Sequence, residues 1–340
     1  MMLRMGRAFS VLLAIAVGAA LFVFAFRGIR VEELGETLSN FSPGWLPVLV
    51  ALPVLDLLIR AVRWRLLLNP VVRARVWELF QFEAIGMAVN NLLFLRVGEL
   101  ARGVVTGKEL GVHTLSVLAT IVVERLCDTV ALLGLFVAGS LMVPEGMDPR
   151  LTFTALALVL AILLVLALIT AAGARFRESA PWLSAHPRVC RVLEDLVLGT
   201  RALRSWPSAL SVASLSLGLW FCDTMIFWAA SRGMGFEPAL SWSDSLVTLT
   251  GAAVGTALPA VPGAFGNFEA AVAITLKHFG YPKPLAISLA TFVHVLSYVI
   301  VTSIGITFLY RLGHTFESLR HVLRRDTASA ADARPGRLVP

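Results

Sequence analysis

The sequence predicts an all-α polytopic membrane protein with six full spans and two re-entrant helical hairpins arranged as an inverted repeat. Three observations support this fold class. Of the 340 residues, 57% are hydrophobic and only 15% are charged, with a mean hydropathy of +0.80, which is typical of a chain that lies mostly in a bilayer. The apolar runs alternate with basic segments, and two of the runs are interrupted by glycine, proline, asparagine or charged residues.

The clearest interruption is the stretch 255–269, GTALPAVPGAFGNFE, inside a long apolar run. Pro259 and Pro262 lack an amide donor, so the helix should break there and restart after the turn. The two arms, 246–258 and 264–277, would each rise about 20 Å, which is short of the roughly 30 Å hydrocarbon core. We therefore predict a re-entrant hairpin at 246–277, with hinge residues Pro259, Pro262, Gly263 and Gly266.

The first half of the chain, residues 1–150, is predicted to form the first repeat. Arg4 and Arg7 precede the first apolar run, and five arginines between residues 60 and 75 close the second. Asparagines and charged residues interrupt 79–106, which favours a first hairpin there, with Gly98 as its hinge. The expected elements are a span at 8–26, an amphipathic surface helix at 29–41, a span at 45–68, the hairpin at 79–106 and a third span at 115–142.

The second half, residues 151–312, is predicted to repeat this order. A fourth span at 151–172 is entirely apolar, and the basic segment 175–206 contains a second amphipathic surface helix. A fifth span at 208–230, the hairpin at 246–277 and a sixth span at 285–310 follow. Residues 313–340 are predicted to be a basic, partly disordered cytoplasmic tail.

The distribution of basic residues predicts the orientation in the membrane. With this scheme, 22 of the 29 Lys and Arg residues fall on one side and 6 on the other, while Arg125 lies within the membrane. The positive-inside rule then places both termini in the cytoplasm of a bacterial or archaeal cell, and favours re-entrant hairpins over full spans. Three spans in each half would turn the second half upside down, and transporters with this plan bind substrate where their interrupted helices meet.

Charged residues within the spans are the main candidates for a site, because each costs at least about 2.5 kcal/mol near the bilayer centre. Glu124 and Asp128 share one face of the third span, and Arg125 can reach Asp128. The cluster is either a self-neutralising packing device or a cation for a phosphate. In the second case we expect Arg125 to contact the phosphate of a lipid.

The hairpins supply the remaining candidates. The first carries Asn91, Arg96, Glu99 and Arg102, which form either an ordinary helix end or a site where free amides and arginines meet an anionic head group, with Glu99 holding an arginine. In the second hairpin, Asn267 and Glu269 belong to a close-packed turn that is compatible with a site. His294 on the last span is interpreted as a packing residue, and Asp56 and Asp223 are left open between structure and function. No catalytic residue, metal or cofactor is expected, and the three cysteines are interpreted as packing residues.

Four segments together resemble the flippase-like family that includes the transmembrane region of lysylphosphatidylglycerol synthase. They are RAVRWRLLL at 60–68, NNLLFLRVGELARG at 90–103, ERLCD at 124–128 and LPAVPGAFGNFE at 258–269. The resemblance covers roughly residues 8–312 and implies that the protein moves charged or sugar-bearing lipids across the membrane. It departs from the family at Phe94, where a proline is favoured, and in ending before any soluble aminoacyl-transfer domain.

Three function classes follow. The first is an ATP-independent translocase for an anionic phospholipid or a polyprenyl-phosphate-linked lipid, since no GxxxxGK[ST] loop is present. The second is a membrane enzyme acting on lipid phosphates or lipid-linked sugars, and the third is a proton-coupled solute transporter. The expected partners are a membrane lipid and a separately encoded enzyme that makes it; no nucleic acid is expected.

Overall fold

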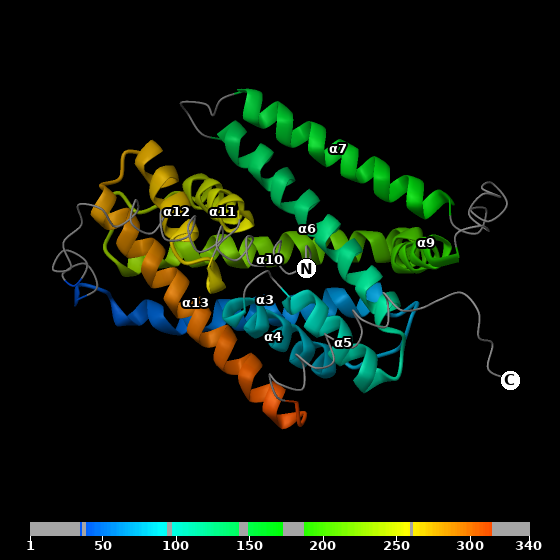
Figure 1. Ribbon diagram of the computed structural model, residues 1–340. Helices are drawn as coiled ribbons and strands as arrows, with labels where there is room; N and C mark the ends of the chain where they lie inside the picture. The colour runs from blue at the N-terminus through cyan, green and yellow to red at the C-terminus, as the bar shows by residue number, and fades with distance from the viewer. Residues whose placement is uncertain are drawn as a thin grey trace, which may run out of the picture.

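The computed structural model describes residues 39–93, 97–142, 149–172, 187–258 and 261–314, together with Gly35 (Figure 1). This part of the chain is helical throughout and contains no strand, which confirms the all-α class. Short 3-10 turns lie at Pro43–Trp45, Arg201–Arg204 and Pro262–Ala264. The helices are α3 (Leu46–Leu68), α4 (Val76–Leu92), α5 (Gly98–Leu110), α6 (Thr114–Met142), α7 (Pro149–Ala172), α9 (Pro187–Thr200), α10 (Trp206–Gly233), α11 (Trp242–Ala257), α12 (Asn267–His278) and α13 (Lys283–Arg311).

Within the described part of the chain, four helical segments are long and apolar enough to cross a membrane: Pro43–Leu68, Pro149–Ala171, Trp206–Gly233 and Lys283–Arg311. They correspond to four of the six predicted spans. Helix α6 has the same length as α13, 29 residues, but carries three charged residues near its middle. The predicted span at 8–26, nearly all of the surface helix at 29–41 and most of the C-terminal tail lie outside the described residues.

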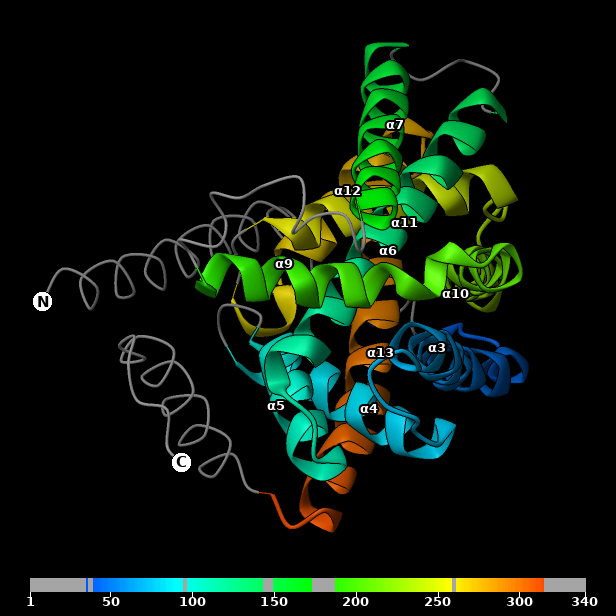
Figure 2. The ribbon, with the colours of Figure 1, turned by 90° about the vertical axis from the view of Figure 1, so that its right-hand side faces the viewer.

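The order of a long helix, two short helices and a long helix occurs twice in the described chain. The first set is α3, α4, α5 and α6, and the second is α10, α11, α12 and α13. Helices α3 and α10 pack against each other, while the short pairs α4/α5 and α11/α12 lie toward opposite sides of the molecule (Figures 1 and 2). This arrangement is consistent with an inverted repeat, which remains a prediction.

Both predicted interruptions contain a helix end followed by a new helix. Helix α4 ends before an extended Leu93 (φ −113°, ψ 150°), and α5 begins at Gly98. A side chain at position 98 would meet the carbonyl oxygen of Gly86 at 2.0 Å, so glycine lets α5 begin directly against α4. The amide of Gly98 also donates to Oδ1 of Asn90, at 2.7 Å.

The second break also consists of a helix end, an extended residue and a new helix, but more turn residues separate its two helices. Helix α11 ends at Ala257 and Leu258 is extended (ψ 154°). Gly263 and Gly266 have positive φ angles of 71° and 85°, a conformation that glycine adopts without steric cost. Helix α12 therefore restarts at Asn267, three residues later than the sequence predicted. Pro259 lies outside the described residues, and whether either helix pair is re-entrant remains a prediction.

Helix α7 lies at one edge of the molecule, where it packs against α6 and α9 (Figure 1). Most of its large apolar side chains face outward, with Phe153 at 70% exposure and Leu168 at 59%, as expected for a helix surrounded by lipid. The predicted surface helix in the segment 175–206 corresponds to α9, which crosses α6 (Figure 2). Ser116 of α6 donates a hydrogen bond to Asp195 of α9 at 2.7 Å.

Candidate functional site

Helix α3 carries one acidic and two basic residues on a single buried face. Asp56, Arg60 and Arg63 are spaced four and three residues apart, which places them along one side of a helix. Oδ2 of Asp56 accepts a hydrogen bond from Nε of Arg60 at 2.7 Å. The sequence analysis counted both arginines among the cytoplasmic residues that close the second span. The structure corrects this, because both side chains are buried inside the bundle.

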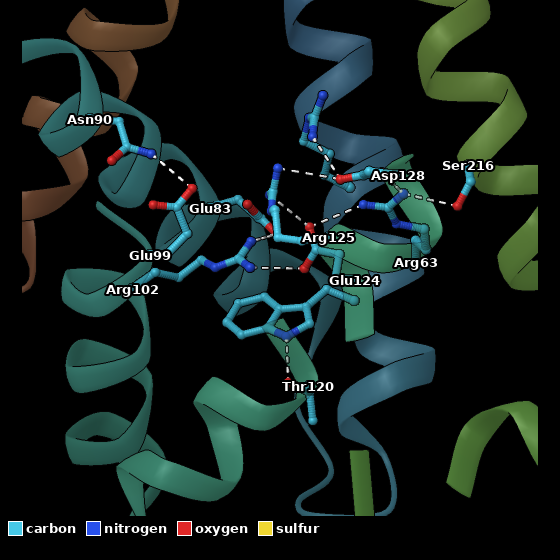
Figure 3. A network of polar contacts seen from close by, with 12 residues as sticks. Arg63, Glu83, Asn90, Glu99, Arg102, Thr120, Glu124, Arg125, Asp128 and Ser216 are labelled. Carbon is cyan, nitrogen blue, oxygen red and sulfur yellow. Dashed lines mark hydrogen bonds and ion pairs between the residues drawn. The ribbon is translucent and has the colours of Figure 1, made fainter. Parts of the chain in front are cut away.

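Helix α6 places its charged triplet directly against this face of α3 (Figure 3). Nη2 of Arg63 donates to Oε1 of Glu124 at 3.0 Å, and its Nη1 donates to Asp128. Arg125 lies 3.1 Å from Oε1 of Glu124 and 3.3 Å from Oδ2 of Asp128. The triplet therefore meets arginines from a second helix as well as its own.

The hairpin α4/α5 adds a third group of charges. Arg102 of α5 pairs with Glu83 of α4, and its Nη2 donates to Oε2 of Glu124 at 2.8 Å. Its guanidinium group lies over the ring of Trp64, 4.3 Å from the centroid, where a cation–π contact favours the charge. The indole of Trp64 donates in turn to Thr120 at 3.1 Å. The close approach of α4 and α5 at Gly98 brings Arg102 within reach of both carboxylates.

Helix α10 completes the arrangement from the other half of the chain. Ser216 accepts a hydrogen bond from Nη1 of Arg63 at 2.9 Å, and Asp223 lies 3.9 Å from Nη2 of Arg60. We call the connected set the ion-pair network. It consists of Asp56, Arg60, Arg63, Glu83, Arg102, Glu124, Arg125, Asp128 and Asp223.

The network is buried except at two residues. The side chains of Arg60, Arg63 and Arg102 are at most 7% exposed, whereas that of Arg125 is 41% exposed and that of Asp223 is 23% exposed. Four guanidinium groups face five carboxylates, so the network carries one excess negative charge when all are ionised. The sequence analysis named Arg125 as the cation of the cluster that includes Glu124 and Asp128. Instead, three buried arginines share that role, and Arg125 lies where the network opens.

A second polar arrangement lies along α13. His294, Tyr298 and Thr302 follow one another at intervals of four residues, and we call them the α13 stripe. His294 contacts the second helix break, with Nδ1 2.7 Å from Glu269 and Nε2 2.8 Å from the carbonyl oxygen of Gly263. Thr302 accepts from Asn91 at 2.8 Å, and the hydroxyl of Tyr298 donates to the Asn91 carbonyl at 3.4 Å. The stripe therefore connects both helix breaks.

The other predicted site residues take local roles. Glu99 accepts a hydrogen bond from Asn90 at 3.2 Å, while Arg102 pairs with Glu83 and Glu124, so the prediction that Glu99 holds an arginine is not met at Arg102. Arg96 lies outside the described residues. Asn267 donates to the carbonyl of Gly255 at 3.3 Å. Glu269 accepts from the amide of Gly266 at 2.7 Å and thereby caps α12.

The sequence analysis missed Arg60, Arg63 and Glu83 as site residues and did not settle Asp56 or Asp223. A signal for the two arginines was present, because Asp56, Arg60 and Arg63 share a helix face within an apolar run. Glu83 likewise lies in the apolar stretch FQFEAIGMAV, where an unpaired carboxylate would be costly. His294 was interpreted as a packing residue, but both of its ring nitrogens have polar partners.

The fold and the network define an α-helical integral membrane protein whose polar site is enclosed by helices from both halves of the chain. The family described as the lysylphosphatidylglycerol synthase TM region matches residues 11–305, and the chain belongs to this family. A relative, the UPF0104 membrane protein of Methanothermobacter thermautotrophicus, is 26% identical over 292 residues, which cover 79% of this chain and 84% of the relative. No solved structure matches the sequence.

Proposed function

We propose that the protein is a lipid translocase, which moves an anionic phospholipid or a polyprenyl-phosphate-linked lipid between leaflets without ATP. The observation that carries the proposal is the position of Arg125. Its guanidinium is partly exposed, while the carboxylates of Glu124 and Asp128 beside it are at most 6% exposed. A lipid phosphate can reach this arginine without dismantling the buried part of the network.

The buried arginines and carboxylates suit a role in holding Arg125 in place. Glu124 forms ion pairs with Arg63 and Arg102 as well as with Arg125. Its negative charge therefore stays paired when Arg125 binds a phosphate instead. The acyl or isoprenyl tails would remain among lipids throughout, and only the head group would cross through protein. Membership of a family named after the membrane region of a lipid synthase supports a lipid as the cargo.

The same proposal includes the topology. The two sets of one long, two short and one long helix would form an inverted repeat, divided near residue 150, with each short pair entering the membrane from a different face. Both termini would lie in the cytoplasm of a bacterial or archaeal cell, and the lipid would be made by a separate enzyme.

The test is a leaflet-resolved assay in reconstituted vesicles. Labelled anionic phospholipids and polyprenyl phosphates are placed in one leaflet, and their appearance in the other is followed with a membrane-impermeant quencher. We expect wild-type protein to move at least one of these lipids and Arg125→Gln to lose the activity. Arg65→Gln, which changes an exposed arginine at the end of α3, is the matched control and should transport normally.

The same samples separate the two alternatives. A covalent change in the lipid, detected by mass spectrometry, would indicate a membrane enzyme. Proton-driven uptake of a soluble solute with no change in lipid leaflet would indicate a transporter of small molecules. Equal rates for wild-type and Arg125→Gln protein would remove the phosphate-binding role from Arg125.

A further inference from the structure

The imidazole of His294 is held between two hydrogen-bond acceptors. Nδ1 lies 2.7 Å from Oε1 of Glu269, and Nε2 lies 2.8 Å from the carbonyl oxygen of Gly263. The rings of Phe265 and Phe268 pack against the imidazole, each with its centroid 4.5 Å from that of the imidazole. The side chain is 12% exposed, so water can replace little of this contact set.

These contacts require one proton more than a neutral imidazole beside a carboxylate can supply. A neutral imidazole has one N–H, while both of its neighbours here are acceptors. Both contacts are hydrogen bonds only if the imidazole is doubly protonated, or if Glu269 is protonated and donates to Nδ1. In either case the histidine and glutamate together hold a removable proton in a poorly hydrated place.

The proton shared by His294 and Glu269 controls the contacts that fix the conformation of the second helix break. Oε2 of Glu269 accepts from the amide of Gly266 at 2.7 Å, so this carboxylate already fixes the start of α12. Without the extra proton, a ring nitrogen with a bare lone pair faces either Oε1 of Glu269 or the carbonyl of Gly263. The repulsion falls on the turn 261–266, whose glycines at 263 and 266 have positive φ angles and can change conformation at little steric cost.

Charged residues on the elements around α13 are engaged elsewhere, so they do not replace Glu269 as the partner of His294. Among the described residues, Tyr298 is the next titratable group along the same face of α13, and the α4 residue that meets this face, Asn91, is uncharged. Arg65, Lys277 and His278 are exposed. The engaged residues are Asp56, Arg60, Arg63 and Asp223 in the network, Glu83 with Arg102, Glu78 at the start of α4 and Arg232 over Trp228.

We infer that His294 and Glu269 form a proton-binding site that fastens the turn 261–266 to α13, and that loss of the proton releases the turn. If the protein is a translocase as proposed above, this site gives it a means of coupling lipid movement to a proton. The α13 stripe would carry the change to the first helix break, because Tyr298 and Thr302 contact Asn91.

The test measures access to the turn and needs no lipid transport. The three cysteines at 127, 190 and 222 are replaced by alanine and a single cysteine is placed at Ala264, in protein reconstituted in lipid nanodiscs. Maleimide labelling is measured from about pH 5.5 to about pH 8.5, the range in which histidine titrates, and each rate is divided by that of denatured protein at the same pH. We expect the ratio to rise about fivefold with pH, the change that one hydrogen bond of ordinary strength makes.

Glu269→Gln gives the sharpest expectation. Its amide oxygen can accept from Gly266 while its NH₂ group donates to Nδ1, so a neutral imidazole can donate to Gly263 and the turn stays fastened. Labelling should therefore remain slow across the whole pH range. His294→Gln removes the imidazole and should give a flat profile, whereas His278→Gln, at the exposed end of α12, should keep the wild-type profile.

A flat profile in the parent protein, or an unchanged pH response in either Glu269→Gln or His294→Gln, would overturn the inference. Two variants are used so that a folding failure in one leaves the other informative. Since labelling does not depend on transport, an inactive protein with the expected labelling profile would count against the translocase alone. Transport without pH-dependent labelling would count against the proton site alone.

Discussion

Replacing Arg63 should test whether the ion-pair network holds the bundle together. Arg63 is fully buried and contacts Glu124, Asp128 and Ser216, which lie on two other helices. Arg63→Met keeps the length and apolar bulk of the side chain but removes its charge and its five donors. The excess negative charge of the network then rises from one to two.

The expected cost follows from what remains. Breaking a buried ion pair by removing one partner costs about 3–5 kcal/mol. Glu124 keeps Arg102 at 2.8 Å, and Asp128 keeps Arg125 at 3.3 Å, so we expect a value near the lower limit, about 3 kcal/mol. Arg125 is 41% exposed, and solvent screening limits the cost of Arg125→Gln to about 1 kcal/mol.

Equilibrium unfolding with denaturant in detergent micelles measures both free energies. A second substitution, Asp128→Asn in the Arg63→Met protein, removes the added negative charge and should recover part of the lost stability. If Arg63→Met costs no more than Arg125→Gln, or if Asp128→Asn gives no recovery, the burial of Arg63 between three helices does not stabilise the fold and the reasoning fails.

Three further predictions concern packing, the turn and topology. A side chain at Gly305 would meet the carbonyl oxygen of Ala84 at 2.1 Å, so Gly305→Ala should lower the free energy of unfolding by about 1–3 kcal/mol. Gly134→Ala should not lower it, because a Cβ atom at position 134 would have no neighbouring atom within 4 Å. At Gly263 φ is 71°, and a Cβ atom added there would lie 2.7 Å from the ring of Tyr298. Gly263→Leu should therefore abolish transport yet leave membrane insertion intact, as shown by membrane fractionation; normal transport would mean that the turn is not part of the site. A cysteine at position 283 should react with an impermeant reagent from outside intact cells, and reaction only from the cytoplasm would reverse the proposed orientation.

Local chemistry made part of the fold predictable. Prolines and glycines in 255–269 remove donors and permit positive φ angles, so the position of the second break followed from the sequence to within three residues. The charged triplet Glu124, Arg125 and Asp128 was identifiable because its cost in an apolar helix is large wherever the helix packs. Each of these inferences depends on a few neighbouring residues.

The partners of those charges could not be predicted in the same way. Arg63 and Ser216 are separated by 153 positions in the chain, and no periodicity relates them. Arg60 and Arg63 also belong to a run of five arginines between 60 and 75, which resembles the basic flank of a span. Whether such an arginine lies at the membrane surface or inside the bundle depends on which helix covers it, and α6 and α10 cover both of these.

The way the network divides its charges among the helices has a consequence for how the chain enters the membrane during synthesis. Of the network residues, α3 brings a net charge of +1, from Asp56, Arg60 and Arg63, and α6 brings −1, from Glu124, Arg125 and Asp128. The hairpin between them contributes the neutral pair Glu83 and Arg102. Once α6 has left the ribosome, the first half can therefore settle in the bilayer with its network charges balanced.

Asp223 arrives about eighty residues later, on α10, as a carboxylate with no arginine of its own in the network. Its entry adds a negative charge to a network whose charges in the first half are already balanced. When α10 packs against the folded first half, the charge of Asp223 must therefore be met in one of two ways. Either Arg60 pairs with both Asp56 and Asp223, or Asp223 takes up a proton. A chain truncated after α6 would be expected to insert more readily than one truncated after α10.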